Sequence, residues 1–186
     1  MKKILTTLLM SLVFGFAQAQ YSTEDEMHIY NFTDPTSPSG GYRFFTGIVT
    51  AINPNNCTPV VQGQTAAYIY PGESTVYKKF QGSGASYIPI NSWTVYTGTS
   101  TQTYNQSQVQ LSIFEPLSRW GGFLAEYLDV ATLSYGQNIQ IGYGYSGSGS
   151  TCYNNGLNHT DSYINAYSFY VLGTAPNQEN YYVIIQ

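Results

Sequence analysis

The chain has 186 residues, of which only 9% are charged; 10 acidic residues outnumber 6 basic ones, and the formal net charge is −4. This balance makes nucleic acids and anionic membrane surfaces poor partners, because no basic stripe would attract their phosphates. The chain is 42% hydrophobic and has 19 tyrosines, which excludes a disordered protein. A surface with few charges and many hydrogen-bonding groups is typical of extracellular β domains and carbohydrate-binding proteins.

The first nineteen residues have the pattern of a secretory signal peptide. Lys2 and Lys3 precede an apolar run over 4–16, and Ala17-Gln18-Ala19 fits a cleavage site. An N-terminal membrane anchor is the weaker alternative, because the apolar run is short for a bilayer and no second one follows. We therefore expect an exported protein, either secreted, at the cell surface or periplasmic, with no transmembrane segment in the mature chain.

The mature chain, 20–186, has the length of one domain. It keeps four basic residues against ten acidic ones, which gives a formal charge of −6. Residues 20–41 are interpreted as an N-terminal arm, because an acidic cluster and a short strand-like piece are followed by turn-forming residues. The remainder, 42–186, is predicted to be a single β domain.

Strand signals dominate from residue 42 onwards. Residues 42–52 are rich in aromatic and β-branched side chains and stop at an Asn-Pro-Asn-Asn turn. Residues 66–80 read as a strand, a Pro-Gly turn and a second strand, which predicts a hairpin. The following segment, 86–104, contains Pro89, which fits an edge strand or a bulge better than a central strand.

Residues 96–104, YTGTSTQTY, alternate threonine with glycine, serine and glutamine. A period of two is that of a strand, yet neither face of this strand is apolar. We therefore expect an exposed or edge strand, whose polar character limits edge-to-edge aggregation.

Two segments show clean hydrophobic alternation. Val109, Leu111 and Ile113 are separated by polar residues, and 139–145 alternates isoleucine and tyrosine with glutamine and glycine. This pattern predicts two antiparallel strands whose apolar side chains enter one shared core. Residues 161–173 and 180–186 complete the chain as two further strands.

One segment departs from the strand pattern. Leu124, Tyr127, Leu128 and Ala131 lie at helical spacing, so residues 123–132 are interpreted as a short helix. A strand is the alternative, because tyrosine and valine favour sheets. The sum is an all-β fold with at most one short helix, an antiparallel β-sandwich or jelly roll, with a barrel as second choice.

Cys57 and Cys152 are the two cysteines of the chain. In an exported protein such a pair indicates a disulfide, which we predict here. A metal site is the rival interpretation, although there is no CxxC spacing and only His159 lies near Cys152. The amides and Asp161 around His159 are interpreted as turn residues rather than calcium ligands. We expect no metal and no cofactor.

Some acidic residues lie close to aromatic ones in sequence, which makes an enzyme the alternative to a binding protein. A small secreted glycan-active hydrolase would need two carboxylates, and the candidates are Glu115, Glu126 and Asp129. Such an enzyme must bring two of them together in a cleft, whereas a binding protein needs only a suitable face.

Aromatic side chains suggest a carbohydrate-binding role instead. Indole and phenol rings offer flat apolar faces with a polar edge, on which sugar rings can stack. The candidate ligand-binding residues are Trp93, Trp120, Tyr143 and Tyr145, although each tryptophan could equally anchor the core. The sequence therefore favours a non-enzymatic binding or structural role, with a glycan or another surface protein as partner. A subunit of a surface assembly is a further alternative.

Overall fold

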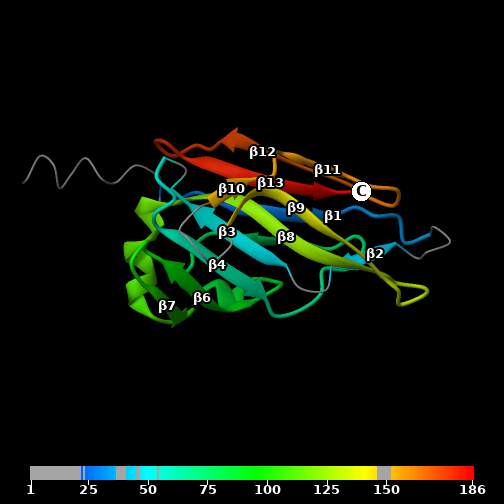
Figure 1. Cartoon of the computed structure of the whole chain (residues 1–186), viewed down its shortest axis with the longest axis horizontal. Coiled ribbons are helices and arrows are strands. Elements are labelled where there is room, and N and C mark those ends of the chain that lie inside the picture. The colour runs from blue at the N-terminus through cyan, green and yellow to red at the C-terminus, as the bar shows by residue number, and fades with distance from the viewer. Residues whose placement is uncertain (1–21, 23, 37–40, 45–46, 54, 146–151) are drawn as a thin grey trace, which may run out of the picture.

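The computed structural model describes residues 22, 24–36, 41–44, 47–53, 55–145 and 152–186, so that the predicted signal peptide lies outside the described residues. Two β-sheets pack as the two layers of a sandwich (Figure 1), and neither closes on itself, which confirms the predicted fold class. The segments that are not strands include three short 3-10 turns, η1 (Ser83–Ala85), η2 (Val109–Ile113) and η3 (Glu115–Leu117).

The five-stranded sheet has the order β11-β12-β13-β1-β5. Its strands are β11 (Asn158–Thr160), β12 (Asn165–Leu172), β13 (Glu179–Ile185), β1 (Met27–Asn31) and β5 (Ser74–Tyr77). The eight-stranded sheet has the order β10-β9-β8-β3-β4-β6-β7, and β2 additionally pairs with β8. Its strands are β10 (Cys152–Asn154), β9 (Tyr135–Tyr145), β8 (Arg119–Asp129), β3 (Ile48–Ile52), β4 (Val60–Thr65), β6 (Ile90–Tyr96), β7 (Thr101–Asn105) and β2 (Tyr42–Phe44).

Strand β1 comes from the segment interpreted as an N-terminal arm, and it lies inside the five-stranded sheet. It pairs in parallel with the C-terminal strand β13 and antiparallel with β5. Met27 and Ile29 are fully buried, while His28 and Tyr30, which alternate with them, face outwards. This part of the arm is therefore integral to the sandwich.

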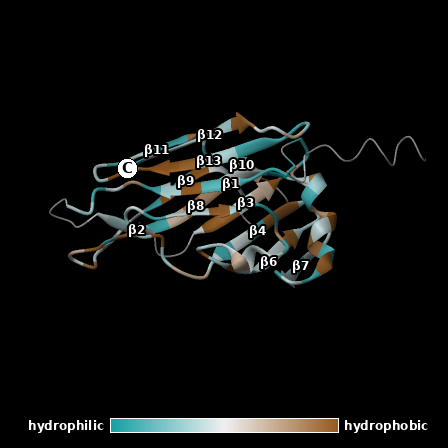
Figure 2. Cartoon of the chain, turned by 180° about the vertical axis from the view of Figure 1, so that it is seen from behind, coloured by the Kyte–Doolittle hydropathy of each residue, from teal (hydrophilic) through white to brown (hydrophobic). Residues whose placement is uncertain are grey.

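The core lies between the two sheets. Hydrophobic and hydrophilic residues are interleaved along the strands (Figure 2), as period-two alternation with one buried face requires. The five-stranded sheet contributes Met27 and Val183, and the eight-stranded sheet contributes Val49 and Phe123, all at most 1% exposed.

The prediction of a strand at 109–113 is wrong, because these residues form the 3-10 turn η2. Leu111 is buried, but Val109 and Ile113 are 65% and 62% exposed. The local hydrogen bonds explain this: the N–H of Leu111 donates to the carbonyl of Gln108, three residues back, as in a 3-10 helix. Of the three alternating apolar residues, only Leu111 therefore enters the core.

The helix predicted over 123–132 is also wrong, because 119–129 forms strand β8. Phe123, Ala125 and Tyr127 are every second residue and are all buried, as in a strand with one face in the core. The strand that was the alternative prediction for this segment is therefore correct. Strand β8 pairs antiparallel with β9, which confirms the predicted strand at 139–145 with Ile139 and Ile141 in the core.

The region predicted to be a hairpin, 66–80, does not form one. Its Pro-Gly turn and its second strand, β5, are present, but β5 pairs with β1 rather than with the preceding segment. The threonine-rich segment 96–104 is an exposed edge strand only in its second half: β7, which begins at Thr101, is the last strand of its sheet, and Thr101, Gln102 and Thr103 are exposed. Tyr96 ends β6, and residues 97–100 form the connection between the two strands.

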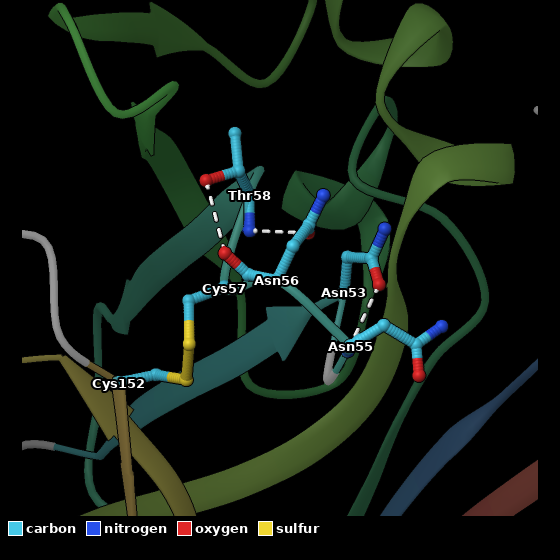
Figure 3. The surroundings of a disulfide bond; sticks show 6 residues. All are labelled: Asn53, Asn55, Asn56, Cys57, Thr58 and Cys152. Carbon is cyan, nitrogen blue, oxygen red and sulfur yellow. Dashed lines mark hydrogen bonds between the residues drawn. A yellow bond between two sulfur atoms is a disulfide. The ribbon is translucent and has the colours of Figure 1, made fainter.

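The predicted disulfide is confirmed. Cys57 lies in the β3–β4 turn and Cys152 begins β10, with the two Cα atoms 5.6 Å apart and a sequence separation of 95. Asparagines shape the turn (Figure 3): the N–H of Thr58 donates to Oδ1 of Asn56, and the N–H of Asn55 to Oδ1 of Asn53. The bond joins this turn to the edge strand β10 of the same sheet and indicates an oxidising environment.

Candidate functional site: a tyrosine groove beside strand β5

An open groove of about 700 Å³ lies beside β5, at the edge of the five-stranded sheet. Three segments meet there: the chain leaving β4, the turn before β5, and the loop that leads into β6. We call it the tyrosine groove, and its lining is Thr65, Ala66, Ala67, Tyr68, Tyr70, Glu73, Tyr87 and Ile88.

The walls of the tyrosine groove are fixed by hydrogen bonds between these segments. The N–H of Ala66 donates to the carbonyl of Pro89 at 2.8 Å, and the N–H of Ile88 donates to Oγ1 of Thr75 at 3.2 Å. The buried hydroxyl of Tyr77 donates to the carbonyl of Ile88 at 2.8 Å. The groove is therefore built on the sheet and is formed in the free protein.

A tight turn places Glu73 between two tyrosines. Pro71 and Gly72 occupy its central positions, and Gly72 has a φ of 82°, which a turn of this kind requires and glycine permits. One oxygen of Glu73 accepts the N–H of Tyr70 at 2.8 Å, and the other accepts the hydroxyl of Tyr87 at 2.7 Å. Both carboxylate oxygens are thus engaged, and the bond to Glu73 raises the pKa of the Tyr87 phenol.

The tyrosines of the groove are partly exposed. Tyr68 and Tyr70 meet edge to face, with centroids 6.0 Å apart and planes at 80°. Tyr70 is 39% exposed and Tyr87 is 67% exposed, and Ile69 between the first two is fully buried. The arrangement combines ring faces at different angles with hydroxyl groups, which suits a ligand with apolar patches and polar edges.

The two tryptophans predicted to bind ligand lie in the core instead. Trp93 is fully buried, and its Nε1 donates to the carbonyl of Phe80 and to Oγ of Ser83, each at 2.9 Å. Trp120 is 4% exposed and donates to the carbonyl of Asp25 at 3.1 Å. Because their rings pack on one another and on Phe80, neither offers a face to a ligand, and the anchoring role applies.

The two predicted tyrosines are on strand β9, away from the tyrosine groove. Tyr143 is half-buried, and its ring lies over Gly121, where an added Cβ would come within 3.2 Å of it. The side chain of Tyr145 lies outside the described residues, although its backbone ends β9. Neither residue lines the groove.

The three candidate catalytic carboxylates stand in three different surroundings. Glu115 accepts the backbone N–H groups of Phe80 and Gln81, and burial raises its pKa. Asp129 accepts the N–H groups of residues 131 and 132 and so closes the β8–β9 turn. Glu126 is half-buried on β8, opposite Asn138 of β9. The described part of the chain shows no cleft that these three share.

A different pair of acids, Asp25 and Glu115, lines one small cavity. Its volume is about 10 Å³, which is room for a single water molecule. Burial raises the pKa of Asp25 to about 6, although its carboxylate accepts the N–H of Glu179 at 2.8 Å. This cavity cannot admit a sugar, so the pair is a buried feature of the fold.

His159 lies in strand β11 rather than in a loop, and the turn that follows is built around Asp161. Asp161 accepts the N–H groups of Tyr163 and Ile164 and the hydroxyl of Tyr127, and Nε2 of His159 lies 3.4 Å from its Oδ2. Among the residues that the structure describes, no group of three or more histidine, cysteine or acidic side chains could hold a metal ion.

Comparison with known proteins gives no match: no family model fits the chain, and no curated protein or solved structure is similar to it. Within the described ranges, none of the helices has the length and apolar character needed to cross a membrane. The functional argument for this protein therefore rests on its own geometry.

Proposed function

We propose that this chain is an exported binding protein that takes a neutral glycan in the tyrosine groove. The single observation that carries the proposal is the groove itself, three tyrosines around a carboxylate whose two oxygens are already hydrogen-bonded. Its volume of about 700 Å³ lies within the range of ordinary ligand sites. The predicted signal peptide and the disulfide support export.

The chemistry of the groove favours an uncharged ligand. Glu73 is its one charged lining residue, and an anionic ligand would be repelled by it and by the acidic chain. Tyrosine faces cover the C–H faces of a sugar, while hydroxyl groups exchange hydrogen bonds with its edges. Because few ions would be displaced, affinity should change little with salt concentration.

The groove also favours binding over hydrolysis. Hydrolysis by the usual route needs two carboxylates on opposite sides of the scissile bond. Glu73 is the one carboxylate that lines this groove, and its two hydrogen bonds hold it in place as a structural element.

A glycan array followed by titration calorimetry tests the proposal. Tyr87→Ala should weaken binding of a neutral oligosaccharide by about 1–3 kcal/mol, roughly a five- to hundredfold rise in Kd. Tyr70→Ala should act in the same direction, and Tyr153→Ala is its matched control, because Tyr153 on β10 has the same 39% exposure.

Hydrolysis should be monitored in parallel with binding. Turnover of any glycan that disappears in Glu126→Gln would support the hydrolase alternative instead. Equal affinities in Tyr87→Ala and the unmodified protein would remove the groove from the binding site.

A further inference from the structure

The outer face of the five-stranded sheet carries a second group of aromatic side chains, unrelated to the tyrosine groove. Alternation buries every second residue of its central strands and turns the others outwards. We call this surface the aromatic face, and its rings belong to His28, Tyr30, Phe32, Tyr167, Phe169 and Tyr182.

The rings of the aromatic face stand parallel to one another across three strands. Phe169 and Tyr182 have centroids 5.3 Å apart and planes at 7°, and Tyr182 and His28 are 4.4 Å apart at 5°. These spacings match the distance of about 4.8 Å between neighbouring strands, so the ring normals run from strand to strand. The rings therefore cover each other's faces and turn their edges towards solvent.

Edge-on rings do not suit a sugar, which stacks on an exposed ring face. They form ridges that suit another apolar surface. One ridge is Phe169–Tyr182–His28, and the next, two residues further along each strand, is Tyr167–Ile184–Tyr30. Ile184 is shorter than its tyrosine neighbours and only 9% exposed, so the second ridge is lowest at its centre.

Part of the charge at the border of this surface is paired, although the chain as a whole is acidic. Glu26 and Lys78 form an ion pair at 3.1 Å there, and Glu26 also bonds His28 at 3.0 Å. Two copies of an acidic chain repel each other in general. The Glu26–Lys78 pair lowers that repulsion at this border.

The size of the face suits a weak association. The five strands contain 27 residues in total, which at about 3.3 Å per residue and about 4.8 Å between strands cover roughly 430 Å². Two copies would bury roughly 860 Å² in total, the size of a weak interface. Phe32 and Phe169 are 57% and 38% exposed here, and an apolar patch of this size often marks an interaction site.

We infer that the aromatic face is where a second copy of this chain packs, sheet against sheet, to form a two-fold dimer. A two-fold axis lying between the two ridges exchanges them, so that Tyr182 of one protomer packs over Ile184, the lowest point of the partner's second ridge, and the reverse. Each ridge then meets its complement, which an unrelated partner would have to match by chance.

Sedimentation velocity from about 1 to 100 μM, a range that populates complexes of micromolar Kd, tests the dimer. The mature protein should sediment as a dimer at the upper end, and Phe169→Lys should raise the Kd at least a hundredfold. Thr103→Lys adds the same charge on the exposed edge strand β7 and should change the Kd less than twofold.

Phe32→Lys serves as a second variant at the other end of the aromatic face, and near-ultraviolet circular dichroism checks that each variant is folded. A mature protein that stays monomeric at about 100 μM overturns the inference, whether or not vesicles or another protein bind this face. A dimer that persists in both folded lysine variants overturns it as well. Tyr87→Ala should leave the dimer unchanged, which separates this test from that of the tyrosine groove.

Discussion

The tyrosine groove and the aromatic face are built from the same kind of side chain but expose different parts of it. In the groove, Tyr68 and Tyr70 meet at 80° rather than in parallel, and Tyr87 is 67% exposed. On the aromatic face, Tyr182 is covered on both sides by parallel rings. Loops let rings adopt different angles, whereas neighbouring strands force them into register.

This difference decides what each surface can bind. An accessible ring face with a fixed hydroxyl suits a ligand that has both C–H and O–H groups, whereas a row of ring edges suits another dry surface. The number of tyrosines in a region is therefore a poor guide to its partner, and the backbone that carries them is the better one.

Both surfaces depend on one core, so the largest expected effect comes from Trp93. Trp93→Ala should lower the free energy of unfolding by about 3–5 kcal/mol, because it opens a cavity and removes two hydrogen bonds. Chemical denaturation followed by tyrosine fluorescence measures this. Groove binding and dimer formation should be lost together as the protein unfolds. If groove binding survived without dimer formation, or the reverse, the two surfaces would not belong to one cooperatively folding unit.

The role of Trp93 shows where sequence reasoning works and where it stops. Alternation and turn residues predicted a β-sandwich and the strand at 139–145, because a sheet with one buried face leaves a period of two in the sequence. The two cysteines predicted the disulfide from their number and the expected export. A tryptophan in polar sequence, however, looks the same whether its ring is buried or exposed, since only tertiary packing decides.

Short patterns failed for a related reason. Val109, Leu111 and Ile113 alternate as in a strand, but five residues are equally compatible with a 3-10 turn that buries only Leu111. The tyrosine groove was missed because its parts are far apart in sequence: Tyr70 and Glu73 lie in an apparent hairpin turn, and Tyr87 follows much later. The bond between Glu73 and Tyr87 is a tertiary contact without a local signature.

The disulfide should matter for stability and not for either surface, because it joins the β3–β4 turn to strand β10 within the eight-stranded sheet. Replacing Cys57 and Cys152 by serine together should lower the free energy of unfolding by about 2–4 kcal/mol. Denaturation under non-reducing conditions measures the loss. Below the melting transition, glycan affinity and the dimer Kd should match those of the unmodified protein. A change in either one would connect the disulfide to that surface.

Asp25 is a buried carboxyl group two residues before strand β1. The outward-facing side chains of β1 belong to the aromatic face. Burial raises the pKa of Asp25 from 3.8 to about 6, so the folded state binds the proton more tightly than the unfolded state does. The protonated carboxyl group of Asp25 therefore contributes fully to the free energy of unfolding below pH 4. This contribution falls by about 2 kcal/mol as the pH rises towards 6. Asp25→Asn should remove that part of the pH dependence, measured by denaturation between pH 4 and 7. An unchanged pH profile would contradict the burial of this carboxyl group.

The smallest expected effect distinguishes the two surfaces most directly, because it removes only a hydroxyl group from each. Tyr87→Phe deletes the exposed hydrogen bond to Glu73 that joins the sides of the tyrosine groove. Glycan affinity should therefore fall by roughly two- to fivefold, less than in Tyr87→Ala, because water partly replaces an exposed bond. Tyr182→Phe keeps the ring and its stacking on His28 and Phe169, so the dimer Kd should change by less than about twofold. Titration calorimetry and sedimentation velocity on both variants give a glycan Kd and a dimer Kd for each.

If the loss of the hydroxyl weakened the dimer as strongly as the glycan complex, the aromatic face would bind through polar contacts. The distinction between ring faces and ring edges would then be wrong.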